Sequence, residues 1–161
     1  DQGMSDLADP SGRVFRRLPG GATELLLARL PGPNGIAIDA VERRLFVAMT
    51  RTNSIVRATL DGALATRVSI YLQLSGGGGP DGIALTGDGG LAVARPESEV
   101  VQLFDRRGDL ALTVDLAVGT RGTNIVFGGP DLTSLYITES DTGTIQVADV
   151  GIPGRAHTFD F

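Results

Sequence analysis

Three polar residues, Asn34, Asp81 and Asn124, recur at nearly equal intervals, each just before a short apolar run. Asn34 lies 47 residues before Asp81, which lies 43 residues before Asn124. The amide oxygen of Asn34 and the carboxylate of Asp81 are ligands that suit a hard cation such as calcium, provided that the fold brings them together. The alternative is structural, because Asn-Gly and Asp-Gly after proline are common turn sequences.

These polar residues belong to a repeated phrase, which indicates how they are positioned. The copies are residues 33–38 (PNGIAI), 80–85 (PDGIAL) and, more loosely, 123–127 (TNIVF). A period of about 40–50 residues is typical of β-propellers, in which each repeat forms one four-stranded blade. The innermost strand of each blade borders the central channel. We therefore expect the loops that enter these strands to bring Asn34 and Asp81 together at the channel mouth.

Turn residues divide the chain into short apolar runs, which predicts an all-β fold without a convincing helix. The one helical-looking window, residues 22–30, is flanked by glycine and proline and fits an outer strand equally well. We expect about three and a half propeller blades: residues 1–30 end one blade, and residues 31–74, 75–116 and 117–161 form the next three. The expected strands are 13–18, 23–30, 35–39, 45–49, 55–60, 67–74, 82–86, 91–95, 100–105, 111–116, 124–128, 134–139 and 144–150, with 157–161 as a further outer strand.

Composition and charge exclude several classes of function. The net charge is −5 and the arginines are scattered, whereas nucleic-acid binding calls for a clustered basic face. No apolar run reaches the roughly 18 residues of a membrane span. The chain has no cysteine, so it has neither disulfides nor a thiolate nucleophile, and its compartment stays open. We therefore expect no nucleic-acid partner and no membrane partner.

Other polar residues are weaker candidates. Asn124 occupies the third copy of the motif, where lining the channel and capping the strand entry are equally good interpretations. Asp1 would lie near the same mouth, although a solvated terminus is the default. His157 stands alone, which argues against a histidine-based triad or a multi-histidine zinc site. Arg51, Arg95 and Glu139 are expected to be solvated charges at strand ends, and Gly76–Gly79, which lacks a following Lys-Ser/Thr, to be a linker.

The motifs also carry a resemblance to a known family. They are residues 33–37 (PNGIA), 80–84 (PDGIA), 123–132 (TNIVFGGPDL) and 135–138 (LYIT), together with 1–3 (DQG) and 12–16 (GRVFR). In this order they resemble the C-terminal half of the gluconolactonase/regucalcin (senescence marker protein-like) family of six-bladed β-propellers. The resemblance implies a six-bladed type of propeller, of which this chain supplies about half.

The resemblance also implies a function and a metal. Members of the family are metal-dependent lactonases, which often bind calcium and sometimes zinc, manganese or magnesium. Their asparagine ligand falls on Asn34, and their aspartate, a ligand and proton acceptor, falls on Asp81. The family also uses a glutamate from its N-terminal blade, which no residue here matches. The sequence thus predicts hydrolysis of a sugar lactone or aldonolactone, with a non-catalytic binding or scaffold propeller as the alternative.

An incomplete set of blades has a further consequence. The apolar side chains of Val14 and Leu25–Leu27 are expected to find no partner from this chain, because the inner strands of their blade are absent. Open strand edges and blade faces favour association. We therefore expect either that this arc is part of a longer protein or that the chain self-associates.

Overall fold

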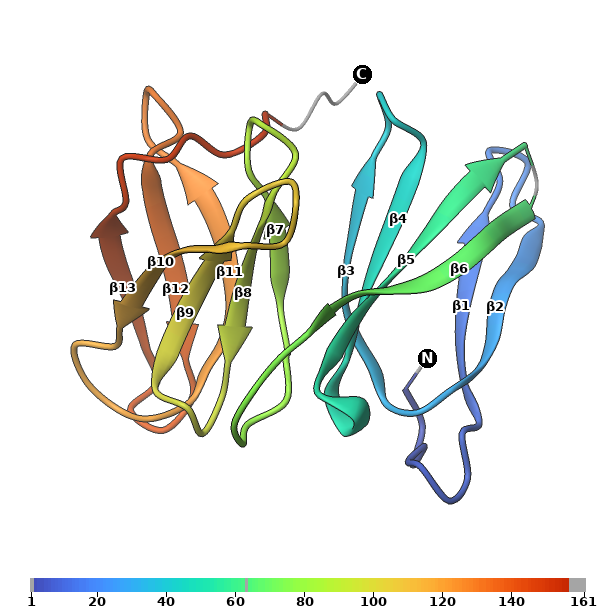
Figure 1. Ribbon diagram of the computed structural model, residues 1–161, viewed down its shortest axis with the longest axis horizontal. Coiled ribbons are helices and arrows are strands. Elements are labelled where there is room, and N and C mark those ends of the chain that lie inside the picture. The colour runs from blue at the N-terminus through green and yellow to red at the C-terminus, as the bar shows by residue number, and fades with distance from the viewer. Residues whose placement is uncertain (1, 63, 157–161) are drawn as a thin grey trace. The chain divides into compact units, whose positions relative to one another are not determined.

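The computed structural model describes residues 2–62 and 64–156 and is built from antiparallel strands (Figure 1). These residues contain one short 3-10 turn, η1 (Thr50–Thr52), and no α-helix. The strands are β1 (Gly12–Arg17), β2 (Thr23–Leu30), β3 (Pro33–Asp39), β4 (Arg44–Met49), β5 (Ser54–Asp61), β6 (Leu64–Gln73), β7 (Ile83–Leu85), β8 (Leu91–Arg95), β9 (Val100–Phe104), β10 (Leu110–Asp115), β11 (Gly122–Gly128), β12 (Ser134–Glu139) and β13 (Thr144–Asp149).

The strands form four sheets in which neighbours in sequence are neighbours in space. Two sheets are complete four-stranded meanders, β3-β4-β5-β6 and β7-β8-β9-β10. A three-stranded meander, β11-β12-β13, follows them, and a two-stranded sheet, β1-β2, precedes them. A four-stranded antiparallel meander is the blade of a β-propeller. The all-β fold and its repeating blades are therefore as the sequence predicts.

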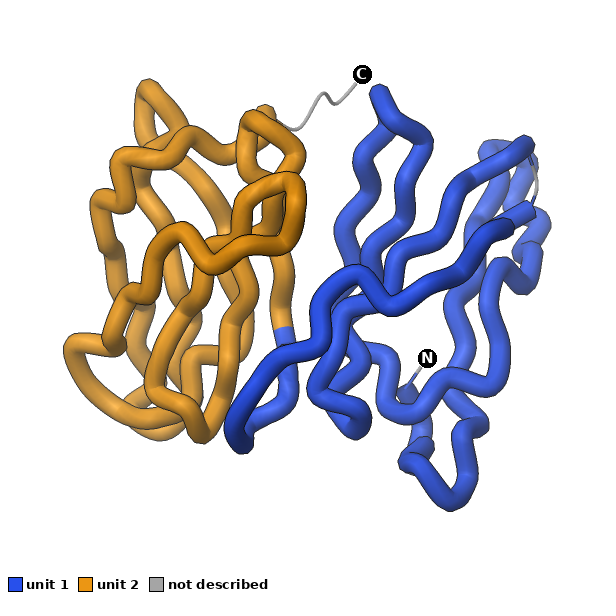
Figure 2. Tube along the Cα trace, in the orientation of Figure 1, with its two compact units in different colours: residues 1–81 blue, residues 82–161 orange. Residues whose placement is uncertain are grey.

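Each of two compact units has its own core, residues 1–81 and residues 82–161 (Figure 2). In the first, side chains of β1 and β2 pack against β4 and β5. In the second, β8 and β9 pack against β11 and β12, with Leu103 and Leu135 fully buried. Both cores are packings of sheet on sheet. Consecutive residues are buried along β4 and β8, so these strands are covered on both faces, whereas buried and exposed residues alternate along β12.

The expectation that Val14 and Leu27 lack a partner was wrong. Val14 is 6% exposed and Leu27 is 8% exposed, because both belong to a core cluster that also contains Leu45 and Val47 of the next sheet. Leu25, on the opposite face of β2, is 55% exposed, so only this face of the two-stranded sheet is open. Self-association through open faces stays a prediction.

Strand boundaries differ from the sequence analysis mainly at β6. It begins at Leu64 rather than near Arg67, and Arg67 adopts a left-handed φ of 51° within it. The register of β6 against β5 shifts at this point, so Arg67 lies in a β-bulge inside the strand, where the sequence pattern predicts the first residue of the strand.

The predicted strand at 157–161 lies outside the described residues. Among residues that the structure describes, no helix is long and apolar enough to span a membrane.

Candidate functional site

Asn34 lies at an irregular point of the first inner strand. Pro33 pairs with Met49 and Ile36 with Val47, so β3 carries one more residue than β4 between these pairs. Such a bulge changes the direction in which side chains project and is frequent beside functional sites. The side chain of Asn34 is exposed at this bulge.

Asn34 and Asp81, the two sequence-predicted ligands, lie together. The backbone N–H of Gly35, the neighbour of Asn34, donates to the carbonyl oxygen of Asp81 at 3.1 Å, and the Asn34 side chain lies near enough to influence the Asp81 carboxyl group. Asp81 is half-buried, and this burial raises the pKa of its carboxyl group, while the Asn34 side chain partly opposes the rise. The structure thus places an amide beside a carboxylate whose charge is incompletely solvated, an arrangement that a bound cation would stabilise.

A third residue, which the sequence analysis missed, connects the two motifs. Thr50 Oγ1 lies 3.3 Å from Asn34 Nδ2 and 2.7 Å from the carbonyl oxygen of Pro80. Thr50 is the first residue of η1, directly after β4, and its own N–H donates to Gly32. Its only signal in the sequence is its position at the end of the strand that pairs with β3.

Gly79 is required for the close approach of the second motif to η1. A Cβ atom at residue 79 would lie 2.1 Å from the carbonyl oxygen of Thr50, which is too close for any side chain. The glycine run is therefore more than a linker, because its last residue packs against the turn that carries Thr50.

We expect Gly79→Ala to destabilise the protein by about 1–3 kcal/mol, the usual cost of overpacking a close contact. Gly77→Ala is the matched control, because a Cβ there meets no heavy atom within 4 Å, and it should stay within about 0.5 kcal/mol of the wild type. Urea unfolding followed by circular dichroism measures both. Equal midpoints for the two variants would contradict the packing described here.

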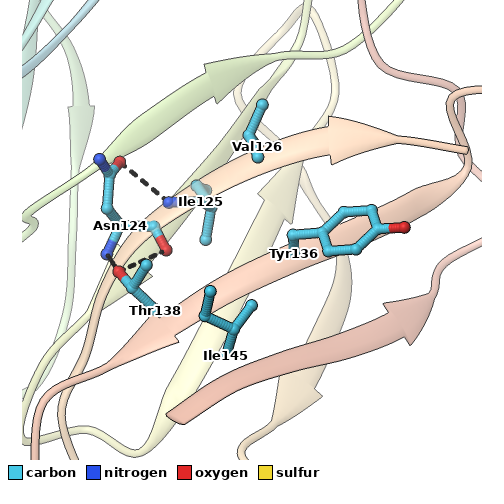
Figure 3. Close-up of a pocket in the computed structure, with 6 residues that line it drawn as sticks. All are labelled: Asn124, Ile125, Val126, Tyr136, Thr138 and Ile145. Atoms are coloured by element: carbon cyan, nitrogen blue, oxygen red, sulfur yellow. Dashed lines mark hydrogen bonds between the residues drawn. The ribbon is translucent and has the colours of Figure 1, made fainter. Parts of the chain in front are cut away.

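The third motif residue, Asn124, makes local hydrogen bonds (Figure 3). Its Oδ1 accepts from the N–H of Ile125 at 2.9 Å, and its own N–H donates to Thr138 Oγ1 at 3.0 Å. A Cβ at residue 82 would lie 2.3 Å from Asn124 Oδ1, so the glycine of the second motif makes room for this side chain. These contacts are those of a strand-entry cap, and the role of Asn124 in lining a channel stays a prediction.

Asn124 also borders an apolar pocket of about 290 Å³ on the sheet β11-β12-β13. Figure 3 shows the lining side chains, which come from all three strands. Ile145 is 70% exposed in this lining, so the pocket is a hollow in an open sheet face. The lining residues are Asn124, Ile125, Val126, Tyr136, Thr138 and Ile145.

Two of the charges expected to be solvated are buried instead. Arg95 is 4% exposed and donates to Gln102 Oε1 at 3.0 Å, and its burial lowers the pKa of its guanidinium. Glu139 is 2% exposed. Arg95 is the last residue of β8 and Glu139 the last residue of β12. Arg51 is exposed, as expected. Asp1 and His157 lie outside the described residues.

Glu139 organises the turn after β12. Its carboxylate accepts hydrogen bonds from Thr142 Oγ1 at 2.5 Å and from three backbone N–H groups, those of Thr142, Asp141 and Arg121. These bonds, that of the Thr142 side chain foremost, lower the pKa of Glu139 from 4.5 to about 2. The residue is thus held as a structural anion.

This low pKa gives a pH-dependent prediction. The stabilisation by ionised Glu139 is complete above a pH of about 4.5, the ordinary pKa, and is lost as the pH falls toward about 2. Glu139→Gln should therefore lower the melting temperature at pH 7, and its difference from the wild type should shrink on acidification through this window. Glu97→Gln, which alters an exposed ion pair with Arg121, is the control and should change little at either pH. A deficit of Glu139→Gln that is independent of pH would refute the role given to its charge.

The pair Asn34–Asp81 supplies two oxygen-bearing side chains. Within residues 2–62 and 64–156, no three His, Cys, Asp or Glu side chains gather in a way that would hold a metal ion.

Comparison with known proteins identifies the family. The model of the SMP-30/gluconolactonase/LRE-like region matches residues 1–141. The chain belongs to this family. The matched region contains all the motifs at 33–37, 80–84, 123–132 and 135–138.

Individual relatives agree with this assignment. A pentonolactonase, XacC of Haloferax volcanii, is 30% identical over 149 residues, which cover 82% of this chain and 51% of the relative. The calcium-binding protein regucalcin of Agrobacterium tumefaciens has a similar structure, with a TM-score of 0.79 and 23% identity over 91% of this chain and 55% of that chain. A luciferin-regenerating enzyme gives a TM-score of 0.80 at 18% identity, covering 91% and 54%. This family member thus has a propeller fold and spans about half the length of these relatives.

Proposed function

We propose that this chain contributes the Asn34–Asp81 part of the active site of a metal-dependent lactonase. One observation carries the proposal: two motifs whose polar residues are 47 positions apart meet in space, through the backbone bond from Gly35 to Asp81 and through Thr50, in a chain of the gluconolactonase family. The substrate class is a sugar lactone or aldonolactone. The activity belongs to a protein of the relatives' length that contains this chain.

The residues present fit a hard divalent cation, for which calcium is our first choice, ahead of zinc, manganese and magnesium. Asp81 would supply an anionic oxygen and Asn34 a neutral one, and calcium prefers such ligands. The raised pKa of the Asp81 carboxyl supports this assignment, because a half-buried carboxylate without a cation partner is disfavoured. When bound, the cation would polarise the lactone carbonyl and stabilise the charge that develops on its oxygen.

Asp81 is proposed to move the proton. Water adds to the carbonyl carbon of the lactone while the Asp81 carboxylate accepts a proton from that water. The bond between this carbon and the ring oxygen then breaks, and Asp81 returns the proton to the leaving oxygen, which gives an open-chain hydroxy acid. A carboxyl whose pKa is raised toward the working pH is a better proton acceptor than one at its ordinary value.

Asn34 would hold the ion without adding charge. Its side chain favours the ionised form of Asp81 and opposes the effect of burial. Asn34 thus tunes the proton acceptor.

The test uses a protein of the relatives' length that contains this chain. Its hydrolysis of an aldonolactone is monitored by the acid that the reaction releases. Turnover that requires both a divalent metal and the Asn34–Asp81 pair supports the lactonase. The alternative, a binding or scaffold propeller, predicts no turnover with any aldonolactone or metal. In that case the pair would be a structural link between two strand entries.

A further inference from the structure

The hydroxyl group of Thr50 has only one hydrogen, and the structure shows where it goes. Thr50 Oγ1 lies 2.7 Å from the carbonyl oxygen of Pro80, which can only accept. The hydroxyl must therefore donate to Pro80. Toward Asn34, 3.3 Å away, Thr50 can then act only as an acceptor.

This constraint fixes which end of the Asn34 amide faces Thr50. A side-chain amide has two N–H donors on Nδ2 and only acceptor sites on Oδ1. Asn34 must therefore present Nδ2 to Thr50, and one hydrogen of Nδ2 is engaged there. Among the described residues, Asn34 Oδ1 accepts no hydrogen bond.

We propose that Thr50 is a positioning residue that orients the Asn34 amide so that its oxygen stays available to a divalent cation. This inference rests on the proposed function for the identity of the ligand. The same hydroxyl ties the carbonyl of Pro80, next to Asp81, to η1. One side chain therefore sets both the amide orientation of one ligand and the backbone position of the other.

Loss of this hydroxyl has a defined consequence. In Thr50→Val the shape is kept, but Asn34 loses the acceptor that holds Nδ2 in place, and Pro80 loses its donor. The amide gains freedom to rotate, and its oxygen is directed toward the ion for only part of the time. Removing a residue that orients a metal ligand typically weakens metal affinity about 10–100-fold.

The experiment uses three variants of a protein of the relatives' length that contains this chain, the form to which the proposed function applies. Thr50→Val removes the hydroxyl, and Thr50→Ser retains it. Thr52→Val is the matched control, because Thr52 lies in the same turn but bonds to Met49 and Ser54 rather than to Asn34. Two quantities are measured: the chemical shifts of the Asn34 side-chain amide in the metal-free protein by NMR, and the affinity for calcium chloride by isothermal titration calorimetry.

We expect Thr50→Val to shift the Asn34 amide resonances and to weaken calcium binding about 10–100-fold. Thr50→Ser and Thr52→Val should match the wild type in both readouts. Unchanged Asn34 resonances in Thr50→Val, or calcium affinity equal to that of a calcium-binding wild type, would overturn the proposal. If the wild type binds no calcium, the proposed function fails, and the NMR comparison alone decides whether Thr50 orients Asn34.

Discussion

Replacing Asp81 by asparagine is expected to lower kcat for aldonolactone hydrolysis about 10²–10⁴-fold, the usual contribution of a positioned proton acceptor. Asparagine keeps an oxygen that can face the ion but cannot accept the proton of the attacking water. The variant should fold normally, because Asp81 is held chiefly through its backbone carbonyl, which accepts from Gly35. Initial rates in a protein of the relatives' length, measured by acid release, give the comparison.

Asp61→Asn is the control for this substitution. The Asp61 side chain is 78% exposed and forms a long ion pair with the exposed Arg43, so its charge should not affect turnover. A variant Asp81→Asn that retains wild-type kcat, with Asp61→Asn also unchanged, would contradict the role of Asp81 as proton acceptor.

Removal of the metal is expected to have the second large effect. Treatment with a chelator should reduce lactone hydrolysis to the background rate, because the polarisation of the carbonyl is then lost. Addition of excess calcium should restore turnover and should also raise the melting temperature. An ion at 100 times its dissociation constant stabilises the folded state by about 2.7 kcal/mol.

Comparison of calcium with zinc, manganese and magnesium, each added to the chelated protein, would rank the ions. Thr52→Val again serves as a control that should respond as the wild type does. Should the chelated protein hydrolyse the lactone as fast as the metal-loaded one, the proposed mechanism is wrong.

The sequence predicted the blades and the meeting of Asn34 with Asp81 because both follow from periodicity. Repeats in register place equivalent residues at equivalent points of successive blades. The repeated motifs at 33–38 and 80–85 are therefore enough to predict that Asn34 and Asp81 occupy equivalent positions. Metal binding by the pair does not follow from this periodicity.

Other features depend on contacts that no local pattern encodes. Thr50 acts through hydrogen bonds to residues 16 and 30 positions away, so its role emerges only when η1 and the second motif are both in place. Glu139 looks like a strand-end charge, but the turn that follows it supplies three donors and the backbone N–H of Arg121 supplies a fourth. Val14 and Leu27 are buried by a neighbouring sheet rather than by strands of their own.

The most direct test of the Asn34–Asp81 site is a crystal structure of the protein grown with calcium chloride. We expect one calcium ion with Asn34 Oδ1 and an Asp81 carboxylate oxygen both at about 2.3–2.6 Å. The Asn34 amide should keep Nδ2 toward Thr50 in that structure. A calcium ion bound elsewhere, or density at the pair that stays empty at saturating calcium, would contradict the account.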